Sequence, residues 1–369
     1  MTEGKLNPHG LTLDELNDAF APLGVSSAAA AKVFTSIFAR GVRTVEELRA
    51  TPQVPRRVCD FLRDHGEMPA LAVVERRVAA DGFVKYLFES PLGGQFEAVR
   101  IPIFDTKYIV CVSSQVGCAL ACDFCMTGRA GFQRNLKTWE ILDQVTRIRE
   151  EADRPVRGVV FMGMGEPFLN YSESIRAARI LSHSAGFAID GRGITISTAG
   201  IVPAIRRYTL EGHPFRLAFS VTSAIPEKRA RLMPIESTYP LDELIDAIRE
   251  HAAARRERAM IAYVVISGVN TGLEDAVALR DAFAGIPIKL DLIEVTDPEG
   301  RYAPPTSEEL RAFRDHLQIL GAPIARRYSG GKEIGAACGT LAASRSGGRL
   351  LASPASRDDA APAPASPRA

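Results

Sequence analysis

The chain contains 369 residues, of which 46% are hydrophobic and 24% are charged. This balance is typical of a soluble globular protein and excludes a largely disordered chain. Lysine and arginine total 45 against 44 aspartates and glutamates, a net charge of +1, so a nucleic-acid partner would have to be bound by local basic patches. No apolar run is long enough to span a bilayer and no export signal follows Met1, so we expect a cytoplasmic protein without a membrane partner.

The first part of the chain has a helical pattern. Apolar residues recur at helical spacing over residues 11–64, which predicts a small N-terminal helical domain in residues 1–70. Alternating apolar runs separated by glycine turns then predict a β meander as a linking segment over 71–103. At the other end the composition turns to Ala, Ser, Pro, Arg and Gly, and we expect a disordered tail over 344–369.

Residues 104–343 alternate apolar strand segments with amphipathic helical segments, which is the pattern of βα units around a parallel sheet. The expected strands cover 108–113, 157–162, 193–198, 216–222, 260–266 and 287–295, and the expected helices cover 138–150, 172–184, 201–210, 240–255, 273–284 and 307–320. Six units are fewer than the eight that close a barrel. We therefore expect an α/β fold with a partial (β/α)6 barrel, whose site lies at the carboxyl ends of the strands.

Four of the six cysteines fall within a short stretch that begins on the first of these strands. Three of them, Cys118, Cys122 and Cys125, form a Cys-x3-Cys-x2-Cys loop. No second Cys-x2-Cys pair is present in the sequence to complete a structural zinc site. Three thiolates suit a 4Fe-4S cluster with one open iron, so we predict that these residues bind iron.

With this loop the chain resembles the radical S-adenosylmethionine (SAM) superfamily, whose signature has the same spacing. The flanking motifs are similar to those of the RlmN/Cfr family of RNA adenine methyltransferases, and the resemblance covers roughly residues 10–343. The motifs are Cys111-Val-Ser-Ser-Gln-Val-Gly-Cys118, Met126-Thr-Gly-Arg-Ala-Gly-Phe132, Phe161-Met-Gly-Met-Gly-Glu-Pro167, Ser197-Thr-Ala-Gly200 and Ala336-Ala-Cys338-Gly-Thr-Leu341. The family is expected to share the partial barrel and its chemistry.

The resemblance implies one 4Fe-4S cluster, SAM and a mechanism with two further cysteines. Cys338 would take a methyl group from one SAM by nucleophilic displacement. A radical from a second SAM would then remove hydrogen from the methylated Cys338, and the resulting carbon would add to adenine at carbon 2, or at carbon 8. Cys111 would release the product and leave a Cys111–Cys338 disulfide. Glu97 aligns with a glutamate that accepts a proton or contacts the substrate, whereas Cys59 matches nothing in the family and is expected to be a core thiol.

The resemblance also implies contacts to SAM. Gly165 and Glu166 follow the second strand of the barrel, where the Glu166 carboxylate would receive the ammonium group of SAM. The other expected contacts are Ser197, Ser220, Thr222 and Thr296. Two stretches depart from the family pattern. Thr222 replaces a histidine, and residues 291–296 replace two amides and a proline with two acids and a hydroxyl.

The implied substrate is adenine in 23S ribosomal RNA and in transfer RNA, with flavodoxin or ferredoxin as electron donor and a monomer as the favoured state. Several basic residues flank the reactive loops and are expected to face RNA. They are Arg129, Arg134, Lys137, Arg326, Arg327 and Lys332. Two alternatives stay open at this point. The departures at the barrel mouth favour a divergent methylase of a small molecule or peptide, and a cluster-bearing sensor without catalysis would not need Cys111 and Cys338.

Overall fold

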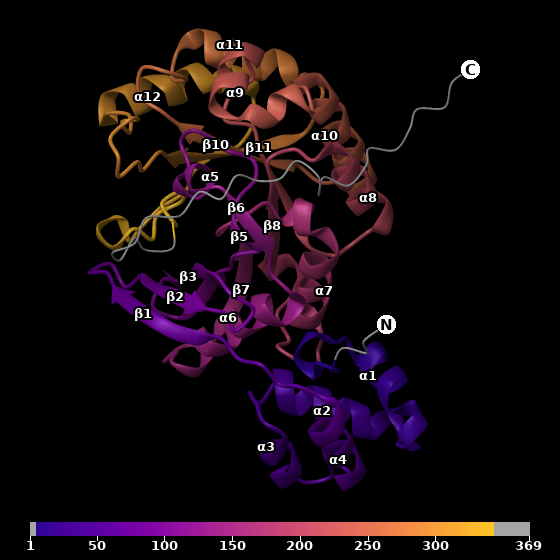
Figure 1. Cartoon of the computed structure of the whole chain (residues 1–369). Coiled ribbons are helices and arrows are strands. Elements are labelled where there is room, and N and C mark those ends of the chain that lie inside the picture. The colour runs from indigo at the N-terminus through magenta and orange to yellow at the C-terminus, as the bar shows by residue number, and fades with distance from the viewer. Residues whose placement is uncertain (1–4, 343–369) are drawn as a thin grey trace.

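Four helices form the N-terminal part of the computed structural model, which describes residues 5–342. They are α1 (Leu13–Phe20), α2 (Ser27–Phe38), α3 (Val45–Ala50) and α4 (Arg56–His65), grouped at the lower end of Figure 1. At the start of α1 the Thr12 hydroxyl accepts from the Glu15 N–H at 3.3 Å, and the Glu15 carboxylate accepts from the Thr12 N–H at 2.8 Å. This capping box satisfies two N–H groups that the helix leaves free. Cys59 is fully buried in the core, as expected.

One ten-stranded sheet runs through the rest of the molecule in the order β1-β2-β3-β4-β7-β8-β9-β10-β11-β12. Its first strands, β1 (Ala72–Val78), β2 (Val84–Glu89) and β3 (Gln95–Ile103), form an antiparallel meander. The next strand, β4 (Lys107–Cys111), pairs antiparallel with β3, and Val99 lies opposite Cys111. The sheet is therefore continuous across residues 103 and 104, where the sequence suggested a domain boundary.

From β4 onward the neighbouring strands run parallel, as the βα pattern predicted. After β4 they are β7 (Val156–Phe161), β8 (Ile194–Thr198), β9 (Arg216–Ser220), β10 (Ala259–Val265), β11 (Ile288–Glu294) and β12 (Ile324–Arg326). The helices that alternate with them are α6 (Thr138–Glu150), α7 (Tyr171–Ser182), α8 (Val202–Glu211), α10 (Leu241–Arg255), α11 (Leu273–Ala282) and α12 (Ser307–His316). The expected partial α/β barrel is confirmed, and β12 adds a short parallel strand that the pattern did not indicate.

Four other short elements were not predicted. Helix α9 (Pro226–Leu232) follows β9, and a separate two-stranded sheet of β5 (Gln115–Gly117) and β6 (Phe132–Asn135) flanks the helix α5 (Met126–Ala130). Each of these elements is too short to produce a periodic apolar signal, so sequence patterning gave no indication of them.

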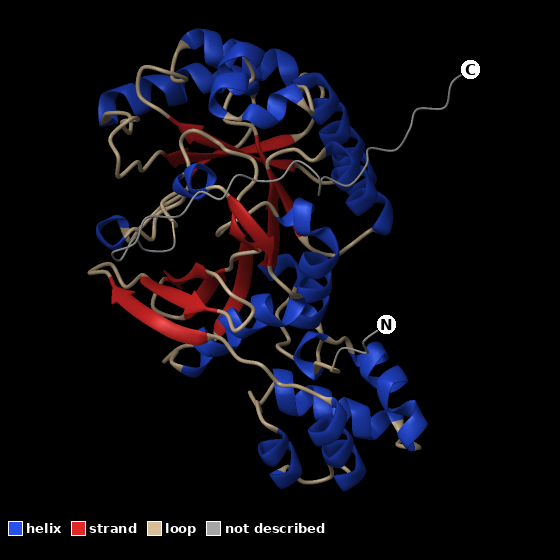
Figure 2. Cartoon of the chain, viewed as in Figure 1, coloured by secondary structure: helices blue, strands red, loops and turns tan. Residues whose placement is uncertain are grey.

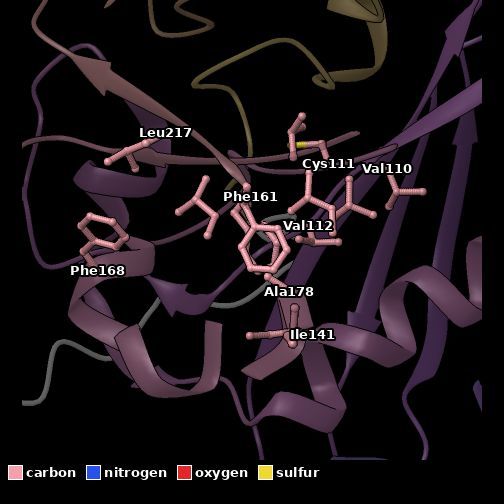
Figure 3. Close-up of a cluster of buried hydrophobic side chains, with 14 of the residues drawn as sticks. Val110, Cys111, Val112, Ile141, Phe161, Phe168, Ala178 and Leu217 are labelled. Atoms are coloured by element: carbon pink, nitrogen blue, oxygen red, sulfur yellow. The ribbon is translucent and has the colours of Figure 1, made fainter. Parts of the chain in front are cut away.

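Helices cover the outer face of the curved parallel sheet (Figure 2). Figure 3 shows part of this packing: Phe161 on β7 meets Ile141 on α6 and Ala178 on α7, and all three are buried. Cys111 is directed away from these residues, toward the inner face of the sheet (Figure 3). Because successive residues of a strand point to opposite faces, alternate residues of the barrel strands are left to line its interior.

The last described segment, residues 327–342, lies opposite β1–β3 (Figure 1). The Tyr328 hydroxyl and the Gly331 N–H each donate to the Asp81 carboxylate at 2.9 Å, so this segment spans from β12 to the meander. The predicted tail at 344–369 lies outside the described residues. Within residues 5–342, no helix combines the length and the apolar character that a membrane crossing requires.

Arg229, on α9, is a large side chain that is fully buried. Its guanidinium pairs with the Glu236 carboxylate and donates to the Ala199 carbonyl at 3.0 Å. Glu236 in turn accepts from the Leu241 N–H at 3.0 Å. These bonds join α9 to the loop after β8 and to the start of α10.

We expect Arg229→Ala to lower the free energy of unfolding by roughly 3–5 kcal/mol, because Glu236 would stay buried without its cation. As a matched control, Arg206→Ala removes an exposed pair with Glu250 and should cost only about 0–1 kcal/mol. Urea unfolding followed by circular dichroism measures both changes. Equal losses for the two variants would contradict a special role for the buried pair.

Candidate active site

The three-cysteine loop begins and ends at the small β5–β6 sheet. Gln115 pairs with Asn135 and Gly117 with Phe132, so the loop leaves and returns at one place beyond the end of β4. Gly117 has a φ of +77°, and a Cβ there would lie 1.9 Å from the Gly131 carbonyl oxygen. Only glycine fits this close approach. The pairing therefore holds both ends of the loop together.

Cys118, Cys122 and Cys125 are all partly buried. Burial, followed by the charges of Cys125 and Glu166, raises the pKa of Cys118 to about 12. Burial and the charges of Cys125 and Cys118 raise the pKa of Cys122 well above its usual value. These mutual effects place the three thiols near one another and near Glu166. In the part of the chain that the structure describes, no three His, Cys, Asp or Glu side chains already have metal-binding geometry.

The donor set of this loop fits the predicted cluster. Thiolates are the usual ligands of a 4Fe-4S cluster, and three of them leave one iron open. Bound iron would also replace the protons that burial favours on Cys118 and Cys122. The loop is fixed from outside, since the Asp123 N–H donates to the Leu232 carbonyl at 3.0 Å and the Tyr302 hydroxyl donates to the Asp123 carboxylate at 2.5 Å.

Cys111 and Cys338 face the same cavity, although they are far apart in the sequence. This cavity, the cysteine cavity below, has a volume of about 420 Å³, is lined mainly by apolar residues and also reaches Cys125. Burial, followed by the neighbouring Cys338, raises the pKa of Cys111 to about 12. Cys338 is exposed, and both residues are free thiols. The fold thus brings together the two cysteines that the resemblance assigned to methyl transfer.

The loop that carries Cys338 is bonded directly to the three-cysteine loop. The Met126 N–H donates to the Gly339 carbonyl at 2.8 Å. The Thr127 hydroxyl donates to the Leu341 carbonyl at 2.5 Å. The predicted methyl carrier and the predicted iron ligands therefore belong to one connected unit.

Glu97 holds the same loop from the side of β3. Its Oε2 accepts from the Ala342 N–H at 2.9 Å, and its Oε1 pairs with Lys85 Nζ at 2.9 Å. Glu97 is only 1% exposed and does not line the cysteine cavity, so its role as a proton acceptor stays a prediction. Sequence reasoning missed Lys85, although its register opposite Val99 puts it on the same face of the meander as Glu97.

Glu166 lies between the glycine turn after β7 and the end of β8. Its carboxylate accepts from the Ala199 N–H at 2.8 Å and from the Phe168 N–H at 2.9 Å. Burial raises the pKa of Glu166 to about 7, against the opposing effect of these hydrogen bonds. Gly165 has a φ of +98°, and a Cβ there would lie 2.5 Å from the Gln115 Cβ. The turn therefore needs glycine to bring Glu166 to the rim beside the cysteines.

The four hydroxyl residues expected to contact SAM form two pairs with different surroundings. Ser197 and Ser220 end neighbouring strands, and their Oγ atoms lie 3.4 Å apart. The Thr222 and Thr296 hydroxyls are buried and have no hydrogen-bond partner among the described residues. Because an unpaired buried hydroxyl is costly, a polar ligand would relieve both, which fits a SAM site. Neither threonine lines the cysteine cavity.

Most of the basic residues expected to face RNA are held in ion pairs, which sequence reasoning did not indicate. That they contact RNA stays a prediction. Arg129 contacts the Asp297 carboxylate through two N–O distances of 2.8 Å, and Arg134 contacts Glu140 at 2.9 and 2.7 Å. The other pairs are Arg326 and Lys332 with Glu294, and Lys137 with Glu173. Arg327 is the exception in this set, since it lines the cysteine cavity.

Comparison with known proteins gives consistent matches. Residues 112–279 match the family described as the radical SAM superfamily. A probable RNA methyltransferase of Myxococcus xanthus is 71% identical over 350 residues, which cover 95% of this chain and 98% of that protein. A dual-specificity RNA methyltransferase RlmN of Syntrophobacter fumaroxidans is 40% identical over 336 residues, covering 90% of this chain and 96% of that protein. The crystal structure of a radical SAM methyltransferase from Sphaerobacter thermophilus is 34% identical, with a TM-score of 0.85 over 92% of this chain and 100% of that chain.

These likenesses extend well beyond the segment that matches the superfamily as a whole, and they cover nearly all of the described residues. Sequence and fold therefore agree on the same class of enzyme. The protein is a radical SAM methyltransferase, and the chain belongs to the RlmN-type family.

Proposed function

We propose that this enzyme methylates adenine at carbon 2, with carbon 8 as the alternative position, in 23S ribosomal RNA and in transfer RNA. Two relatives carry the names RNA methyltransferase and RlmN. The observation that carries the proposal is the single cavity shared by Cys111 and Cys338, because in a two-cysteine mechanism Cys111 must reach the sulfur of Cys338. The enzyme is expected to act as a monomer in the cytoplasm.

Membership of the superfamily implies a 4Fe-4S cluster and SAM. We assign one cluster to Cys118, Cys122 and Cys125, with flavodoxin or ferredoxin as the electron source. The SAM contacts would be Gly165, Glu166, Ser197, Ser220, Thr222 and Thr296. When bound, the cluster and SAM supply a carbon radical that can remove hydrogen from an unactivated C–H bond.

The exposure of the two thiols supports different roles for them. Cys338 is exposed, so its thiolate can attack the methyl carbon of SAM; a C–S bond forms and S-adenosylhomocysteine leaves. Burial raises the pKa of Cys111 to about 12, so Cys111 stays protonated near neutral pH and does not compete for the methyl group. This difference supports Cys338 as the methyl carrier.

Cys111 would act once the carbon is joined to adenine. The adduct would first lose the ring hydrogen as a proton and one electron to an acceptor such as the oxidised cluster. Cys111 would then give up its thiol proton, and its sulfur would attack the Cys338 sulfur. A disulfide forms, and the S–C bond breaks with its electron pair going to the carbon, which takes a proton. Arg327 assists, since its charge opposes the effect of burial on the pKa of Cys111. Two electrons then reduce the disulfide before the next turnover. Glu97 keeps its predicted role at the substrate, and its bond to Ala342 supports an added role in positioning the Cys338 loop.

We expect Cys118→Ala, Cys122→Ala and Cys125→Ala each to remove the iron, because each residue supplies a bond that no neighbour replaces. Cys59→Ala is the matched control, since Cys59 is buried in the N-terminal helices and should leave the iron content unchanged. Iron and sulfide analysis of anaerobically reconstituted protein measures the effect. Stoichiometric zinc without iron in the unsubstituted protein would contradict the assignment.

Substitution of Cys338 and substitution of Cys111 should block the reaction at different steps. Cys338→Ala should abolish methylation without any covalent species, because no thiolate remains to carry the carbon. Cys111→Ala should accumulate enzyme joined covalently to RNA through Cys338, because the release step is lost. Denaturing gels and peptide mass spectrometry after incubation with SAM and a reductant distinguish the two. Full multiple-turnover activity of Cys338→Ala would rule out a methyl carrier at this residue.

The substrate is tested by mass spectrometry of RNA from a strain that lacks this gene. Digested ribosomal and transfer RNA should lose 2-methyladenosine, and the modification should return with the intact gene but not with the Cys338→Ala form. Loss of 8-methyladenosine instead would move the reaction to carbon 8. Unchanged methylation of both RNA classes, with turnover of a small molecule or peptide, would overturn the proposal.

A further inference from the structure

The barrel has a second cavity at the end opposite the reactive loops. It has a volume of about 580 Å³ and lies at the amino ends of the parallel strands, where Lys107 on β4, Arg216 on β9 and Lys289 on β11 contribute to its wall. We call it the lower cavity. Ile109, Val160 and Arg327 line both this cavity and the cysteine cavity. The two cavities therefore adjoin inside the barrel.

Part of the wall of the lower cavity is made of small residues. Gly158, Gly193, Thr195 and Ala325 line the lower cavity at the level of the inner strand surface. In a filled barrel, bulky branched side chains occupy such layers and leave no passage. At Gly158 a Cβ would already lie 3.1 Å from the Ile109 side chain. A larger residue at position 158 would therefore crowd Ile109, which lies where the two cavities adjoin.

The lower cavity is strongly basic, although the chain as a whole carries a net charge of only +1. Its cations are Lys107, Arg157, Arg192, Arg216, Lys289 and Arg327, and its lining includes one carboxylate, Asp291. That carboxylate already pairs with Lys289 at 3.1 Å.

Four of these cations have no side-chain ion pair or hydrogen bond with any residue in the described range 5–342. They are Lys107, Arg157, Arg192 and Arg216. They contrast with the basic residues around the reactive loops, such as Arg129 and Arg134, which are held by Asp297 and Glu140. Unpaired cations around one concave wall create the positive potential that attracts a polyanion.

An exposed aromatic residue lies near Lys107, one of these cations. Phe104 lies in the turn before Lys107, lines the cysteine cavity and is 86% exposed. Its φ is +47°, a conformation that is uncommon for a bulky side chain. Strained residues of this kind concentrate at functional sites. Unpaired cations next to an exposed aromatic ring are the pattern of a surface that binds single-stranded nucleic acid.

We propose that the lower cavity and Phe104 bind the backbone of a single-stranded RNA segment next to the adenine that is methylated. Lys107, Arg157, Arg192 and Arg216 contact phosphates, and Phe104 stacks on a neighbouring base. The target adenine extends through the adjoining cysteine cavity. The inference rests on the proposed RNA substrate and adds the part of the enzyme that holds it.

The spacing along β4 agrees with this arrangement. Lys107 and Cys111 are the first and last residues of the strand and point to the same face. Their backbones are about 13 Å apart, at roughly 3.3 Å per residue. The long lysine side chain extends toward the site and reduces the distance that its ligand must cover. A base turned out of its stack can thus reach the cysteines while its own phosphates stay at the cations. Phosphate contacts of this kind fix position without reading sequence.

The test is the salt dependence of RNA binding by the cluster-loaded enzyme. The probe is a fluorescently labelled RNA stem-loop with an unpaired adenosine in its loop. The triple variant Arg157→Gln, Arg192→Gln, Arg216→Gln should weaken binding by at least roughly tenfold at moderate salt. Its plot of log K against log salt should be shallower by about 2, since each phosphate contact to a single strand contributes about 0.7.

The matched control removes the same charge elsewhere: Arg206→Gln, Arg249→Gln and Arg280→Gln are exposed arginines of the outer helices. It should leave both affinity and slope unchanged. Phe104→Ala should weaken binding without changing the slope, because stacking releases no counterions, and Phe104→Trp should restore the affinity. Iron content and thermal unfolding verify that each variant is folded.

The outcomes separate this inference from the proposed function. If the unsubstituted enzyme methylates the RNA while the triple variant binds it with the same affinity and slope, the lower cavity is not the RNA site and only the inference fails. An equal loss in the control variant overturns the inference in the same way, because the effect would then follow total charge. If the unsubstituted enzyme neither binds nor methylates RNA, the proposed function itself fails.

Discussion

The buried carboxylate of Glu97 holds together the parts of the molecule on which the cysteine cavity depends. One oxygen pairs with Lys85 on the neighbouring strand, and the other accepts from the Ala342 N–H beyond Cys338. Taking such charges out of water is costly, and only complete pairing offsets that cost. Val99, which follows Glu97 by two residues on β3, lies opposite Cys111. Strand β3 therefore fixes one cysteine through strand pairing and the loop of the other through a side chain.

Because successive residues of the barrel strands point to opposite faces, the side chains that pack in the core and those that line the cavities lie on different faces of the sheet. On β4, Tyr108 and Val110 are buried, whereas Lys107, Ile109 and Cys111 line the two cavities. The charge lies at the amino end of the strand and the thiol at its carboxyl end. Because parallel strands begin at one edge and end at the other, repetition of this arrangement on neighbouring strands gathers cations at one opening and reactive groups at the other.

Sequence patterning predicted the regular parts of the structure because they depend on local periodicity. The strands and helices of the barrel lie within a few residues of their expected positions, and the spacing of the three loop cysteines alone indicated that they gather at one point. The ion pairs could not be predicted in this way, since Arg129 is 168 residues from Asp297 in the sequence. RNA contacts were therefore assigned to basic residues that prove to be paired with acids. Arg157 and Arg216 occur singly at strand starts, and only the parallel packing of the strands brings them to one cavity.

Thr222 shows how a departure from the family pattern can be accommodated at the site. It has a φ of +58°, which is unfavourable for a β-branched residue, and it is fully buried. Asn270 holds this conformation, since its side-chain amide donates to the Thr222 carbonyl at 2.7 Å and accepts from the Ile266 N–H at 2.8 Å. The backbone is thus fixed without using the hydroxyl, which has no partner among the described residues. The hydroxyl of Thr222 is therefore a buried polar group that the fold itself does not use.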